Sequence, residues 1–133
     1  MKTDLDWMKR ALEIAGQAGD DCPIGSIVVR NGEELAARHN EVELQSNPVA
    51  HCEMLAIQHA CASLGTRYLT DCTIYCTLEP CPMCMEAIRL AQVQRLIFGA
   101  FRDINHPYTC DTVGGIMSDE CGQLLTEFFR KRR

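Results

Sequence analysis

Two short stretches of the chain hold the side chains best suited to chemistry. His51 and Glu53 are separated by one residue, and Cys81 and Cys84 are separated by two. The cysteine spacing places both sulfur atoms on one side of the first turn of a helix. Two thiolates and one imidazole are a ligand set that suits zinc. The sequence therefore predicts one zinc ion per chain, bound by His51, Cys81 and Cys84.

Three protein ligands leave the fourth tetrahedral position for water, as in a catalytic zinc site rather than a structural one. Glu53 and His51 can both face the ion only if their helix begins near His51, because residues two apart diverge along a regular helix. A carboxylate in that place can accept a proton from the water and later deliver it to a leaving group. We expect Glu53 to be the catalytic acid and base, and not a ligand.

Other interpretations of the cysteines remain open. A Cys-x-x-Cys pair at a helix N-terminus is also typical of redox chemistry. Cys72 and Cys76 could complete a structural four-cysteine zinc site. These two, however, would share one face of a buried strand with Ile74, where thiols are common. Neither alternative explains a histidine and a glutamate at the start of a neighbouring helix, so a catalytic site is favoured.

The hydrophobic pattern predicts the elements that position these residues. Helices are expected over residues 4–15, after a capping pattern at Thr3 and Asp6, and over 51–64, 81–91 and from Ser118 or Asp119 onwards. Strands are expected at 24–30, 34–39, 73–78, 93–98 and, weakly, 112–117, with a hairpin turn at Asn31-Gly32 and a polar loop up to residue 48.

Strands that alternate with helices predict an α/β fold, a three-layer α-β-α sandwich whose five-stranded mixed sheet has helices on both faces. The 133 residues, 47% of them hydrophobic and 23% charged, fit one domain over residues 1–133. No apolar run is long enough for a membrane helix, and charged residues stand where a signal peptide would be apolar. We expect a cytoplasmic protein with no membrane partner.

The charge distribution is uneven. The net charge is −5, but the last four residues carry +4, so the rest of the chain carries −9. An acidic body argues against binding nucleic acid over the whole surface, and we expect no DNA partner. The basic tail is compatible with a nucleic acid bound at one edge. It is equally compatible with solvated cations at the C-terminal end of a helix.

The two stretches together resemble the H-x-E and P-C-x-x-C pattern of the zinc-dependent nucleobase deaminases. Within the cytidine/deoxycytidylate deaminase superfamily, the chain is most similar to the bacterial tRNA-specific adenosine deaminases, over nearly its whole length. The matching positions are 23–25, 40, 47–51, 77–81, 98–100, 119–121 and 128–130. The resemblance implies a cytidine deaminase-like fold, a homodimer and conversion of the wobble adenosine of a tRNA anticodon loop to inosine.

The resemblance also implies residues that bind substrate. Asn40 is expected to hydrogen-bond the base or its sugar, although a residue that merely ends a strand is an alternative. Ile24 and Arg130 belong to matching stretches and are assigned to the same surface. Phe129 is the better candidate for stacking on a base, because Phe128 fits the apolar stripe of the last helix.

The chain departs from the family in two places. Cys52 stands where a small residue such as alanine is usual. We expect it to pack in the core, and an effect on the metal is the alternative. The stretch of residues 102–116 is shorter than the corresponding stretch in typical bacterial members. We expect this to affect the RNA-contacting surface more than the chemistry. Two alternatives are therefore kept: a deaminase of free bases or nucleosides such as guanine or cytosine, and a zinc-containing RNA-binding module without turnover. Ammonia release from a panel of substrates distinguishes them.

Overall fold

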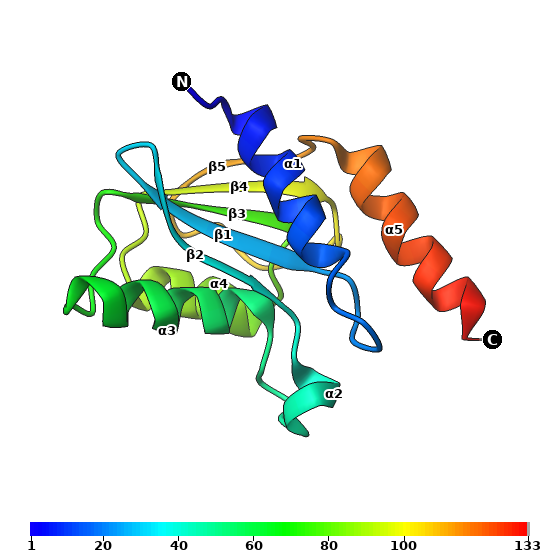
Figure 1. Cartoon of the computed structure of the whole chain (residues 1–133). Helices are drawn as coiled ribbons and strands as arrows, with labels where there is room; N and C mark the ends of the chain where they lie inside the picture. Colours follow the sequence, from blue (N-terminus) through cyan, green and yellow to red (C-terminus); the bar gives the residue numbers. More distant parts are fainter. Residues whose placement is uncertain (133) are drawn as a thin grey trace.

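In the computed structural model, which describes residues 1–132, a five-stranded sheet lies between two layers of helices (Figure 1). The strands are β1 (Gly25–Arg30), β2 (Glu33–His39), β3 (Cys72–Leu78), β4 (Arg95–Ala100) and β5 (Asp111–Val113), in the order β2-β1-β3-β4-β5. β1 pairs antiparallel with β2 and β3, whereas the pairs β3–β4 and β4–β5 are parallel. The mixed sheet predicted from the sequence is confirmed.

The helices are α1 (Asp4–Ala15), α2 (Val42–Gln45), α3 (Cys52–Leu64), α4 (Pro82–Leu90) and α5 (Ser118–Lys131). Figure 1 shows α1 and α5 over one face of the sheet and α3 and α4 over the other. This confirms the three-layer arrangement. None of the helices within residues 1–132 has the length and apolar character needed to cross a membrane.

Successive strand residues pack on opposite faces of the sheet, which gives the molecule two cores. Ile27, Tyr75 and Ile97 lie side by side in the register of β1, β3 and β4, and they pack under α1. The next positions along these strands face α3 and α4; they are Val28, Ile74 and Leu96. Burial on both faces explains why these strands are almost continuously apolar.

A helix cap and a hairpin turn form as their local sequence patterns predict. The Thr3 hydroxyl accepts a hydrogen bond from the Asp6 amide at 3.2 Å, and the Asp6 carboxylate accepts one from the Thr3 amide at 2.9 Å, so the capping box is confirmed. The hairpin turn between β1 and β2 is confirmed by the positive φ angles of Asn31 (51°) and Gly32 (75°).

The expected last helix and last strand need correction. Ser118 is the first residue of α5, and Met117 occupies the N-cap position in a left-handed conformation without a side-chain cap, so a cap at Ser118 or Asp119 was wrong. β5 ends at Val113 rather than at 117. The Gly115 and Ile116 amides donate instead to the carbonyl groups of Gly99 and Phe98, at 3.1 and 3.2 Å, outside the strand ladder.

β4 and α2 also differ from expectation. β4 continues through Gly99, which was expected to end it; a Cβ there would collide with the Cys121 side chain of α5 and lie 2.8 Å from the Thr77 carbonyl oxygen. The polar loop contains the short helix α2, whose Glu43 amide donates to the Asp21 carboxylate at 2.7 Å. That carboxylate lies 22 positions earlier in the chain, so no local pattern could reveal the helix.

Candidate active site

The predicted metal ligands come together at one edge of the sheet. His51 is the N-cap residue of α3, and Cys81 is the N-cap residue of α4, which follows β3 after three residues. Because β1 runs antiparallel to β2 and β3, the start of β1 and the ends of β2 and β3 meet at this edge. Two helix N-termini therefore approach each other where several strands begin or end.

The spacing of the ligand atoms fits zinc. His51 Nδ1 lies 3.6 Å from Cys81 Sγ and 3.6 Å from Cys84 Sγ. Zinc with an imidazole nitrogen at about 2.1 Å and a thiolate sulfur at about 2.3 Å holds these atoms about 3.6 Å apart in tetrahedral geometry. Within residues 1–132, the His/Cys/Asp/Glu group that could hold an ion consists of these three residues alone. Zinc is therefore the cofactor of this site.

The alternative four-cysteine site is not formed. Cys72 and Cys76 are fully buried in β3 and pack in the core that faces α3 and α4, as expected for residues sharing a strand face with Ile74. Neither belongs to the group of metal-binding residues within the described part of the chain. The ligand set thus keeps a position open, as catalytic zinc sites do.

The electrostatics of the cysteines favour a bound cation. Cys81 is the N-cap residue and Cys84 lies in the first turn of α4, where the partial positive charge of the helix N-terminus stabilises thiolates. Burial, and then the nearby charges of Glu53 and Cys81, raise the pKa of the Cys84 thiol. Because zinc binds the thiolate, the ion must displace this proton, and metal binding is coupled to proton release.

Glu53 occupies the first turn of α3 and is 2% exposed. It is not part of the three-residue ligand group, although its charge acts on Cys84. Because α3 begins directly after His51, His51 and Glu53 meet the condition set by the sequence, that their helix begins near His51. A buried carboxylate beside the metal ligands is suited to proton transfer.

Asn40 follows β2 and lies 8% exposed against the N-terminus of α3. The side-chain Oδ1 of Asn40 accepts a hydrogen bond from the backbone N–H of Cys52 at 2.9 Å. The backbone N–H of Asn40 donates to the Ile24 carbonyl at 3.2 Å. Ile24 is buried at the start of β1. Because Oδ1 is engaged with α3, the amide NH₂ group of Asn40 is the end that can donate to a ligand.

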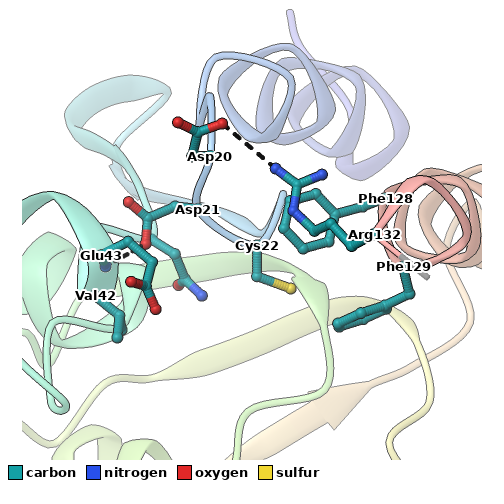
Figure 2. A pocket seen from close by; sticks show the side chains of 9 residues that line it. Asp20, Asp21, Cys22, Val42, Glu43, Phe128, Phe129 and Arg132 are labelled. Atoms are coloured by element: carbon teal, nitrogen blue, oxygen red, sulfur yellow. Dashed lines mark hydrogen bonds and ion pairs between the residues drawn. The ribbon is translucent and has the colours of Figure 1, made fainter.

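A cavity of about 660 Å³ brings Asn40 together with the end of α5 (Figure 2). Its lining consists of Asp20, Asp21, Cys22, Asn40, Val42, Glu43, Phe128, Phe129 and Arg132. Phe129 is 54% exposed, and the Arg132 guanidinium lies over the Phe128 ring at 3.7 Å and near Asp20 at 3.5 Å. Arg130 is exposed on α5 but is not part of this lining, and Arg133 lies outside the described residues.

Glu79 is a buried residue whose role the sequence did not reveal. Its Oε1 accepts hydrogen bonds from the Arg102 and Asp103 amides at 2.9 and 3.2 Å, and Tyr108 donates to Oε2 at 2.7 Å. The last bond raises the pKa of Tyr108 to about 12. Glu79 therefore holds residues 102–108 against the end of β3, which leads into Cys81. Glu79 is 3% exposed, and nothing in the local sequence pattern indicates that this glutamate is buried.

The fold and the site together define a zinc-dependent hydrolytic deaminase. A profile of the cytidine and deoxycytidylate deaminase zinc-binding region matches residues 1–100. The tRNA-specific adenosine deaminase of Bacillus subtilis is 38% identical, over all of this chain and 92% of that protein. The chain belongs to the cytidine and deoxycytidylate deaminase family.

Solved structures agree with this assignment. One, from studies of A-to-I editing by deaminases that act at the wobble position of transfer RNA, has a TM-score of 0.84 and 31% identity, over 89% of this chain and 97% of that one. The guanine deaminase of Bacillus subtilis has a TM-score of 0.72 and 36% identity, over 76% of this chain and 66% of that one.

Proposed function

We propose that this protein converts the wobble adenosine of a tRNA anticodon to inosine and ammonia. The observation that carries the proposal is the cavity that joins Asn40, held beside the metal ligands, to the aromatic and basic end of α5. The exposed Phe129 ring and the Arg132 guanidinium at this cavity suit an RNA strand better than a free nucleobase. The similarity to tRNA-specific adenosine deaminases over the full chain supports the same assignment.

In the proposed reaction, His51, Cys81 and Cys84 hold zinc, which supplies Lewis-acid activation of a water molecule. Glu53 accepts a proton from the attacking water and passes it to the neighbouring ring nitrogen of adenine. After a C–O bond has formed at C6, Glu53 accepts the proton of the new C6 hydroxyl group and delivers it to the exocyclic amine, and the C–N bond breaks to release ammonia. The low exposure of Glu53 keeps bulk water from competing for these protons.

Asn40, Phe129 and the cations of α5 have proposed roles in holding the RNA. The target base must leave its stack to reach the site, and an anticodon loop presents such unstacked bases. We expect the side-chain NH₂ group of Asn40 to donate to the base or its ribose. Phe129 offers a face for stacking, and Arg130 and Arg132 can contact phosphates.

The test is ammonia release from a panel that contains an anticodon stem-loop with adenosine at the wobble position, free adenosine, guanine and cytosine. We expect inosine from the stem-loop, identified by mass spectrometry, and little product from the free compounds. Release from guanine but not from the stem-loop would contradict the proposal. Release from none of the substrates would favour a zinc-containing RNA-binding module.

Deamination of a free base is the second candidate function. The similarity to a guanine deaminase at 36% identity supports it, as does the acidic body of the chain. The carboxylates of Asp20 and Glu43 at the cavity would repel a phosphate backbone on that side. The substrate panel decides between the two candidates.

We also propose that the protein acts as a homodimer in the cytoplasm, where its tRNA substrate is found. Large apolar side chains such as Leu44, Leu90 and Phe101 are 72%, 66% and 54% exposed on the single chain, and a second copy would cover part of this surface. Sedimentation equilibrium of the zinc-bound protein tests the assembly, and a monomer at micromolar concentration would contradict it.

A further inference from the structure

Cys52 is the residue between His51 and Glu53, and it makes polar contacts that a merely packed thiol does not need. It is fully buried. Its Sγ lies 2.8 Å from Glu53 Oε1 and 3.2 Å from the Ser26 hydroxyl, and its amide donates to Asn40 Oδ1 at 2.9 Å. Cys52 is thus in direct contact both with the proposed proton carrier and with the proposed base-binding residue.

The thiol carries one proton, which can go to only one of its two neighbours. The Ser26 hydroxyl is oriented to donate its own proton to Cys76 Sγ, at 3.4 Å. The contact of Cys52 Sγ with Glu53 Oε1, at 2.8 Å, is shorter than its contact with the Ser26 hydroxyl, at 3.2 Å, and a carboxylate oxygen can only accept. Glu53 Oε1 has no other hydrogen-bond donor among the described residues, and a buried carboxylate oxygen without a donor is costly. The thiol proton is therefore directed at Glu53.

We infer that Cys52 is a positioning residue, whose thiol holds Glu53 Oε1 and thereby leaves Oε2 as the oxygen that exchanges protons with water and base. The inference rests on the proposed function, because it assigns a role in the same reaction. The expectation that Cys52 packs in the core is confirmed by its full burial, and the inference adds a role to that packing. Through its amide, Cys52 fixes Asn40 as well, so that the orientation of the base and the orientation of the carboxylate depend on the first turn of α3.

Kinetics with the anticodon stem-loop test the role. Cys52→Ala removes the donor and frees the carboxylate to rotate, so we expect kcat to fall about 10-fold, comparable to the loss of one hydrogen bond to a charged group. KM and the zinc content of one ion per chain should stay the same, because no substrate contact or ligand is changed. Cys52→Ser restores a donor and should recover most of kcat.

Cys72→Ala is the matched control. Cys72 is also fully buried, but it lies at the start of β3 and its thiol faces Asp71 at 3.7 Å. This variant should lower the stability and leave kcat unchanged. If Cys52→Ala behaves like Cys72→Ala, or if Cys52→Ser is no better than Cys52→Ala, the positioning role is wrong.

A second measurement needs no substrate. The infrared S–H stretching band of Cys52 is identified by subtracting the spectrum of the zinc-bound Cys52→Ala variant from that of the wild type. Because the hydrogen bond weakens when its acceptor becomes neutral, Glu53→Gln should move this band to higher frequency. An unmoved band would overturn the inference. Wild-type protein that fails to deaminate the stem-loop but shows the shift would instead contradict the proposed function alone.

Discussion

Among single residues, Glu53 differs from the other buried carboxylates in how its oxygens are bonded. Asp21 accepts from two backbone amides, those of Glu43 and Leu44, and Glu79 accepts from those of Arg102 and Asp103. Glu53 receives only the Cys52 thiol within the described residues. The carboxylates of Asp21 and Glu79 are fixed acceptors that hold backbone segments in place. Glu53 has its Oε1 bonded to the thiol, and its Oε2 is left to exchange protons in the proposed reaction.

The substitution Glu53→Gln tests this difference. Glutamine preserves the size of the side chain but cannot carry a proton between water, base and leaving amine. We expect turnover of the anticodon stem-loop to fall by about 10⁴-fold, the upper end for general acid and base catalysis, because two transfers are lost. Metal analysis and circular dichroism should show unchanged zinc content and fold. A variant that retains a tenth of wild-type activity would exclude Glu53 from the reaction.

At the scale of elements, the site depends on side chains that cap or anchor segments remote in sequence. Asp21 caps α2, Asn40 satisfies an amide at the N-terminus of α3, and Glu79 anchors the stretch that follows β4. Each of these side chains is at least nine-tenths buried. Buried backbone amides need partners, and these carboxylate and amide oxygens supply them.

For the segment after β4, we expect Glu79→Gln to lower the free energy of unfolding by about 2 kcal/mol, since it weakens the bonds to two amides and the Tyr108 hydroxyl. The midpoint of urea unfolding, at an unchanged slope, is the measurement. Glu13→Gln is the control, because Glu13 is an exposed glutamate on α1 paired with Arg10 and should shift the midpoint little. Equal midpoints for both variants would mean that Glu79 does not anchor this segment.

For the molecule as a whole, charge is segregated between an acidic body and the basic end of α5. Arg130 and Lys131 are exposed, whereas Arg132 is paired with Asp20. We expect Arg130→Gln with Lys131→Gln to weaken stem-loop binding and to flatten its dependence on salt by about 0.7–0.9 log units per lost phosphate contact. Fluorescence anisotropy at several salt concentrations measures both effects.

Arg67→Gln is the matched control for the salt dependence. Arg67 follows α3, whose C-terminal end lies on the opposite side of the molecule from the end of α5 (Figure 1). Its removal should leave the slope unchanged. If the α5 double variant also keeps the wild-type slope, Arg130 and Lys131 are only solvated cations at the C-terminal end of the helix. RNA contact must then come from residues 102–110 or from a second copy of the chain.

The stability of the whole molecule should fall in acid through Asp4. Burial raises the pKa of this carboxylate, but hydrogen bonds from Tyr75 at 2.6 Å and Arg95 at 3.0 Å outweigh burial, and the net pKa is lowered. A lowered folded-state pKa stabilises the fold above the unfolded value of about 3.9, and this contribution is lost as the pH falls through the folded-state pKa. The urea midpoint of the wild type should therefore drop more steeply below pH about 4 than that of Asp4→Asn. Parallel curves would contradict this role.

The sequence by itself determined the chemistry and most of the elements. His51, Cys81 and Cys84 could be identified because each of the two short motifs that contain them is local, and the ligand atoms do converge. Periodicity placed the sheet and the four long helices for the same reason, since a helix or strand repeats its apolar positions over a few residues. The capping box at Thr3 and the turn at Asn31 are equally local.

Only the tertiary structure decided how substrate could meet this chemistry. Asn40 contacts the amide of Cys52 twelve positions later, and Phe129 reaches the cavity of Asn40 from the far end of the chain. Glu79 and Asp21 bond to amides more than twenty positions away. A backbone N–H group can donate to any suitably placed oxygen, so the local sequence pattern does not indicate which acceptor it will have. The packing of helices on the sheet selects the partner, and with it the shape of the site.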